Sequence, residues 1–171
     1  MRKWFIGWAV FLVAIMEPAT AGAFAQPERG GLWCHDSPDR LQVVTGDDLD
    51  EAVAKLQKSQ TEAGSGFVVC IEYREEPERR GLITWSRRLV AELGYATTHS
   101  GPEGEAPKRA GILFVYREIK SPVGDWVVDE WFAERQVFTP GKTARADVDH
   151  FLKEFFKTDT EDENVTVWWT K

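Results

Sequence analysis

Residues 67–94, FVVCIEYREEPERRGLITWSRRLVAELG, decide the fold that the sequence predicts. The segment 67–73, which opens with the continuous apolar run 67–71, is typical of a central strand that is covered on both faces. The charged residues at 74–81 predict a solvated turn. Beyond that turn, apolar residues recur at every fourth position and favour a helix over 83–93, which Gly94 is placed to end. The recurring residues are Trp85, Leu89 and Leu93.

Strand and helix signals alternate on both sides of this stretch. Amphipathic helices are expected from about 47 to 63 and over 144–157, because apolar residues recur at i, i+3, i+4 and i+7 in both. In the second helix, Thr143 or Asp147 is suited to cap the start. A hairpin is expected between residues 112–119 and 126–137. Further strands are expected over 41–45 and 165–169.

The order of these elements predicts an α+β protein with helices packed on a mixed or antiparallel sheet. From residue 66 onward the order β-α-β-β-α-β can be laid out as a ferredoxin-like (split βαβ) arrangement, with residues 126–138 as an extra strand. This architecture hosts many unrelated functions, so function has to be argued from particular residues.

The N-terminus has the pattern of an export signal. Arg2 and Lys3 precede an apolar run of 13 residues, which is too short to span a bilayer comfortably. Ala23-Phe24-Ala25 fits the A-x-A cleavage pattern, so we expect residues 1–25 to be a cleaved signal peptide and the protein to be periplasmic or secreted. The alternative is a retained membrane anchor. Residues 26–40 then form an N-terminal lead, and residues 41–171 form a single α/β domain.

The charge balance narrows the class of partner. The formal net charge is −7, and loss of Arg2, Lys3 and Glu17 with the signal peptide changes it to −8. A negative surface disfavours nucleic acid and anionic membranes, and it favours a basic protein partner. No stable membrane anchor is expected after cleavage. Simple solubility is the plainer reading of the same charge.

The two cysteines, Cys34 and Cys70, predict one disulfide in an exported chain. The competing reading is a catalytic or metal-binding thiol, but Cys70 lies in an apolar run where a thiolate would be costly. The disulfide ties down the N-terminal lead. No metal site is expected, because the three histidines are far apart in the sequence.

The sequence contains no specific catalytic or cofactor motif. It has no G-x-S-x-G elbow, no phosphate-binding P-loop and no dinucleotide fingerprint. We therefore expect no cofactor and assign no catalytic residue. A small exported hydrolase, with a site assembled from scattered histidines and carboxylates, remains the alternative function.

Aromatic residues next to carboxylates are the unusual feature of the segment 126–138. Exposed tryptophan beside acidic residues is a common composition of binding surfaces. The candidate partner-binding residues are Trp126, Asp129, Trp131 and Glu134. The competing reading is that helices cover both faces and bury the rings. The sequence thus predicts an exported, non-enzymatic protein-binding module, of the inhibitor or immunity type, for a basic partner.

Overall fold

The computed structural model describes residues 33–36, 38–63, 67–98 and 108–170. The predicted signal peptide and residues 26–32 of the predicted lead lie outside these ranges. No helix within the described ranges is both long enough and apolar enough to cross a membrane.

A six-stranded antiparallel sheet dominates the described chain. Its strand order is β1-β6-β2-β3-β4-β5, and every neighbouring pair is antiparallel. The strands are β1 (Leu41–Val44), β2 (Phe67–Arg80), β3 (Ile83–Thr98), β4 (Lys108–Lys120), β5 (Val127–Phe138) and β6 (Val165–Thr170). The helical elements are α1 (Trp33–Asp36), η1 (Pro38–Arg40), α2 (Gly46–Ala63), α3 (Ala144–Phe151) and the π-helical turn η2 (Leu152–Phe156).

The helix predicted over 83–93 is wrong, because these residues lie in strand β3. Trp85, Leu89 and Leu93 are four residues apart, and a spacing of four also keeps side chains on one face of a strand, where the period is two. The spacing therefore fits both structures. Strands β2 and β4 on either side of β3 decide between them, since they supply its hydrogen-bonding partners.

The turn predicted over 74–81 is also wrong, because β2 continues to Arg80 and the chain reverses only at Gly81 and Leu82. Gly81 has φ +66°, the left-handed conformation that glycine adopts without strain. Pro77 is accommodated because the β2–β3 register shifts between Glu75 and Glu78. Arg87 of β3 pairs with Glu75 and Glu78, and Arg117 of β4 also pairs with Glu75, so the charges of this segment do not require a loop.

The predicted fold class is therefore corrected. The sequence predicts helices packed on a mixed or antiparallel sheet in a ferredoxin-like (split βαβ) order, and this order requires a helix between the strand at 67–73 and the hairpin that begins at residue 112. The residues expected to form that helix lie in strand β3, so β2, β3, β4 and β5 form a continuous antiparallel meander instead. The fold is mostly an antiparallel six-stranded sheet with few helices.

The two faces of the sheet carry separate apolar clusters. On the face here called the helix face, residues of α2 and α3 such as Leu49 and Val148 pack against sheet residues such as Ile71 and Val115. On the opposite face, here called the α1 face, a smaller cluster surrounds Cys34 of α1. Its buried members are Cys34, Cys70, Val90, Ile112, Phe114 and Tyr116. The predicted disulfide between Cys34 and Cys70 is present and fastens α1 to β2. A disulfide is compatible with an oxidising location outside the cytoplasm.

Several local predictions are confirmed. The hairpin of β4 and β5 pairs Ile112 with Val137 and Ile119 with Val127. Helix α2 covers the first predicted helix, while α3 and η2 together cover 144–156 of the second. The Thr143 side chain caps α3 by accepting a hydrogen bond from the Ala146 N–H at 3.1 Å.

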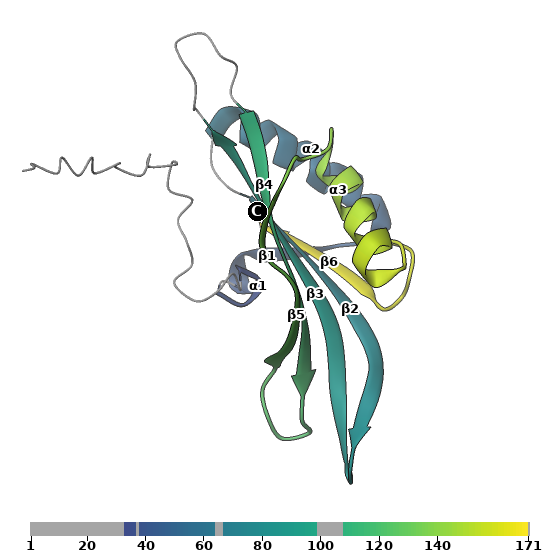
Figure 1. Ribbon diagram of the computed structural model, residues 1–171. Helices are drawn as coiled ribbons and strands as arrows, with labels where there is room; N and C mark the ends of the chain where they lie inside the picture. The colour runs from purple at the N-terminus through teal and green to yellow at the C-terminus, as the bar shows by residue number, and fades with distance from the viewer. Residues whose placement is uncertain (1–32, 37, 64–66, 99–107, 171) are drawn as a thin grey trace, which may run out of the picture.

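The two hairpins extend well beyond the helices, as Figure 1 shows for β2–β3 and β4–β5. We call this extension, residues 74–87 and 117–130, the arm. Because α2 and α3 do not reach it, the arm lacks the apolar cover that buries the rest of the helix face. Charged side chains occupy this face of the arm instead, and their ion pairs hold β5 in position.

Candidate functional site

Strand β5, which carries most of the predicted partner-binding residues, is the last strand of the sheet and pairs only with β4 among the described residues. Its side chains are mostly exposed. Large apolar groups are among them: Trp131 is 38% exposed, Phe132 is 42% exposed and Val137 is 73% exposed. Exposed rings between carboxylates are the composition that the sequence predicted for this segment.

Three register shifts interrupt the pairing of β5 with β4. Trp131 pairs with Tyr116 and Ala133 pairs with Val115, so Phe132 is an extra residue between them. Asp129 is an extra residue in the same way, between Val128 and Glu130. Such bulges bend an edge strand, protect it from adding a further strand, and redirect individual side chains. The β5 surface is therefore suited to side-chain recognition.

The neighbouring rings of Trp131 and Phe132 lie on opposite faces of the sheet. The Trp131 ring lies 5.1 Å from the Tyr116 ring, whose side chain is on the α1 face. The Phe132 ring lies 4.9 Å from the guanidinium carbon of Arg117. By the alternation of β4, Arg117 is on the helix face, like Val115.

The structure does not bring all four predicted partner-binding residues into one patch. Trp126 precedes β5 and is half-buried, with the Arg88 guanidinium over its ring. Asp129 pairs with Arg80 at 3.2 Å. Trp131 lies against Tyr116, and Glu134 is exposed. Trp131 and Glu134, with Phe132 between them in the chain, remain the accessible part of the predicted surface.

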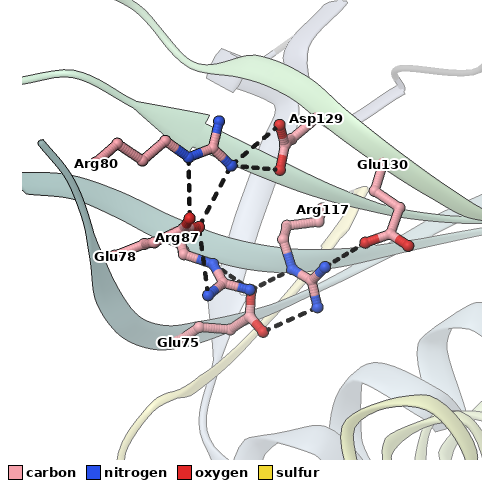
Figure 2. Close-up of polar contacts among 7 residues, drawn as sticks. All are labelled: Glu75, Glu78, Arg80, Arg87, Arg117, Asp129 and Glu130. Atoms are coloured by element: carbon pink, nitrogen blue, oxygen red, sulfur yellow. Dashed lines mark hydrogen bonds and ion pairs between the residues drawn. The ribbon is translucent and has the colours of Figure 1, made fainter.

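A network of ion pairs occupies the arm on the helix face (Figure 2). Arg117 of β4 pairs with Glu75 of β2 at 2.7 Å and with Glu130 of β5. Arg80, at the end of β2, pairs with Glu78 at 3.0 Å and with Asp129 of β5 at 3.2 Å. The network thus joins the two hairpins where no helix covers them. Arg87 of β3 completes it, 3.6 Å from both Glu75 and Glu78.

A second polar cluster lies on the α1 face. Arg88 donates to Glu118 at 2.7 Å and to Glu72 at 2.9 Å, while His35 of α1 lies 3.3 Å from Glu118. The hydrogen bond with Glu118 raises the pKa of His35, although burial opposes it. Burial raises the pKa of Glu118, but His35 and Arg88 outweigh burial and lower it overall. His35 and Glu118 form a partly buried histidine–carboxylate pair of the kind that the hydrolase alternative requires, whereas a second such pair, His150 and Glu154 at 2.9 Å, is exposed on one helical face.

The most deeply buried acidic group of this face is Glu92 of β3, whose side chain is fully buried. Its carboxylate accepts hydrogen bonds from the Trp33 N–H at 2.8 Å, the Cys34 N–H at 3.3 Å and the Tyr116 O–H at 2.6 Å. Burial raises the pKa of Glu92 to about 7, against the opposing effect of these hydrogen bonds. A buried carboxyl that titrates near neutral pH is typical of functional positions.

Sequence reasoning missed Glu92, Arg88 and Tyr116. Glu92 interrupts the apolar run 89–93, and the expectation of a helix there would place its side chain on a solvated face. With the run taken as a strand, alternation places Glu92 on the same face as Val90 and Arg88. A carboxyl within a buried strand was the available signal.

An open groove of 270 Å³ lies where β1 leaves the sheet. Strand β6 continues to Val165, whereas its pairing with β1 stops at Val167. The groove is lined by Val43, Val44, Thr45, Gly46, Leu49, Thr160, Val165, Thr166 and Val167. Among the residues that the structure describes, no group of three or more histidine, cysteine or acidic side chains is arranged to hold a metal ion.

Comparison of the chain with models of protein families, with curated proteins and with solved structures gives no significant match.

Proposed function

We propose that this chain is an exported, non-enzymatic protein-binding module that docks a basic partner through β5. The observation that carries the proposal is the exposure of Trp131 and Glu134 on an edge strand, with the Phe132 ring also exposed on the opposite face of that strand. Aromatic side chains supply large apolar contact areas at interfaces, and they attract partner cations through their ring faces. Glu134 adds an exposed carboxylate that complements a basic surface, whereas Asp129 and Glu130 pair with Arg80 and Arg117 within the protein.

The rigidity of the surroundings supports this proposal. A surface that is already ordered before binding loses less conformational entropy when the partner arrives. The ion pairs of Arg117 and Arg80 hold β5 to β2 through the arm (Figure 2). An inhibitor or immunity-type protein would benefit from such order, because it has to bind one partner tightly.

The test is affinity capture from an envelope extract by the processed protein, followed by measurement of the affinity for the purified partner. We expect one stoichiometric basic protein, whose affinity falls at high salt. The double variant Trp131→Ala/Glu134→Lys should weaken binding at least about tenfold, because it removes a contact ring and reverses a charge. The matched control is Val43→Ala/Glu161→Lys, which alters one exposed apolar and one exposed acidic residue elsewhere. Equal binding by both double variants contradicts the proposal.

A small exported hydrolase remains the second candidate, on the specific observation that His35 lies 3.3 Å from Glu118. Arg88 holds this pair, because it donates to Glu118 and lies 3.4 Å from the His35 ring nitrogen. Turnover of a panel of ester and cell-wall substrates that is lost in His35→Ala would favour the hydrolase over the binding module.

A further inference from the structure

The Glu92 carboxyl is buried among neutral hydrogen-bond donors. The contacts that the structure shows for it come from two backbone N–H groups of α1 and from the Tyr116 hydroxyl. These three donors favour the charged carboxylate, but burial removes the water that would otherwise solvate the charge, and burial has the larger effect on the pKa of Glu92. The ionised form of Glu92 is therefore costly as long as α1 covers it.

The charged groups near Glu92 are committed to one another. His35 of α1, Arg88 of β3, Glu72 of β2 and Glu118 of β4 share the ion pairs of the α1-face cluster. His35 lowers the pKa of Glu92 through its charge, but burial outweighs this and the hydrogen bonds, so the pKa of Glu92 rises to about 7. Because the pKa of His35 is raised and its charge acts on Glu92, an experiment has to distinguish titration of His35 from titration of Glu92.

Segment α1 forms a small cover over this carboxyl. The Trp33 ring meets Phe114 edge to face at 5.0 Å between centroids. It also fills the space above Gly94, where an added Cβ would lie 2.7 Å from the Trp33 Cη2 atom. The disulfide from Cys34 to Cys70 keeps the cover attached to β2 whether or not Trp33 is in place. Any opening of α1 would therefore be confined to a local movement about the disulfide.

We propose that Glu92 is a proton-operated latch for α1: the segment stays closed over the sheet while the carboxyl is protonated, and it loosens about the disulfide when the carboxyl ionises. Loosening admits water to the carboxylate and uncovers the apolar surface of Phe114 beneath Trp33. The latch thus controls access to the α1 face, separately from the β5 surface proposed above.

The direction follows from linkage. In the open state water reaches Glu92, so its pKa falls from about 7 back toward 4.5. The proton consequently binds more tightly to the closed state, and protonation favours closure. The closed state is most favoured below the open-state pKa, and this preference is lost as the pH rises through about 7.

The test is amide hydrogen exchange of Trp33 and Cys34 by NMR, on the processed protein with its disulfide intact. After correction for the intrinsic exchange rate, protection of both amides should fall at least about tenfold between about pH 5.5 and about pH 8.5. In Glu92→Gln, whose side chain keeps the shape and carries no titratable charge, protection should be the same at both pH values. An unchanged protection in the native protein overturns the latch.

Two further variants identify the titrating group. His35→Gln should retain the fall in protection, whereas loss of the fall would make His35 the sensor and overturn the proposal. Tyr116→Phe removes a donor that favours the charged carboxylate, so the midpoint of the fall should move to higher pH. If Glu92→Gln fails to fold, the Tyr116→Phe result decides alone, and an unmoved midpoint contradicts the latch.

Discussion

The guanidinium carbon of Arg88 lies 4.3 Å from the centroid of the Trp126 ring, so a strand in the middle of the sheet is joined to the segment that begins β5. Arg88 also pairs with Glu72 of β2 and with Glu118 of β4. One arginine of β3 therefore holds side chains from three other segments. On the helix face, Arg117 of β4 joins two strands in a similar way, because it contacts Glu75 of β2 and both Glu130 and the Phe132 ring of β5.

Trp126→Ala should lower the free energy of unfolding by about 2 kcal/mol. The substitution removes a half-buried ring and its cation–π contact with Arg88, which is itself partly shielded from water. Urea denaturation followed by circular dichroism measures the change. Val123→Ala in the same hairpin is the control and should be neutral, because that side chain is 99% exposed. Equal effects of the two substitutions would show that the stacking contributes nothing.

Replacing both cysteines by alanine should cost about 4 kcal/mol, the chain-entropy estimate for a link of this span. The half-cystines are 36 positions apart, and Cys70 is fully buried. Comparison of urea unfolding for the native protein and for Cys34→Ala/Cys70→Ala gives the value. The double variant should still fold, because the helix-face cluster does not include either cysteine. A loss below about 1 kcal/mol would mean that α1 contributes little to the folded state.

Local signals in the sequence predicted much of this structure. Periodicity failed where the same spacing of apolar residues fits both a helix and a strand. The helices at 46–63 and 144–151, and the hairpin of β4 and β5, follow from patterns within each segment. The spacing of Trp85, Leu89 and Leu93 fits a strand as well as a helix. Pairing of β3 with β2 and β4 resolves that ambiguity. Information about this long-range pairing cannot be read from a single sequence.

The candidate site was predictable in composition and not in geometry. The rings and carboxylates of β5 are adjacent in the sequence, so the sequence alone identified them as candidate binding residues. The bulges at Asp129 and Phe132 arise from the register with β4, and they break the alternation from which faces are inferred. The Glu92 site could not be assembled for the same reason: Trp33, Glu92 and Tyr116 meet only through the tertiary fold.

Glu118→Gln should destabilise the protein by about 2 kcal/mol or more near neutral pH. The change removes one of the two carboxylates that pair with Arg88, which is mostly buried, and only Glu72 at 2.9 Å still balances its charge within this cluster. The pKa of Glu118 is lowered in the folded state, so the stability that its charge provides is present above its unfolded pKa of 4.5 and is lost as the pH falls through the folded pKa. Urea unfolding of both proteins at a series of pH values should therefore show their difference shrinking in acid.

The control for this pH dependence is Glu76→Gln, an exposed glutamate on β2. Its stability should follow that of the native protein throughout. A difference between Glu118→Gln and the native protein that stays constant down to about pH 3 would mean that packing, and not charge, explains the loss.

Gly111→Ala should destabilise the protein by about 1–3 kcal/mol through overpacking. Gly111 of β4 pairs with Phe138 of β5, whose ring lies directly across the glycine, so an added Cβ would be 2.2 Å from the ring. The ring has little room to move, because it also packs edge to face on Tyr95 at 5.9 Å and on Phe151 at 5.1 Å. Gly46→Ala is the matched control: an added Cβ there meets nothing within 4 Å, so its stability should be unchanged or slightly increased. Thermal and urea unfolding of the two variants measure the difference, and the double variant Gly111→Ala/Phe138→Leu should recover part of the loss, since a smaller side chain relieves the clash. A Gly111→Ala protein as stable as Gly46→Ala would show that β5 can shift away from β4 at little cost.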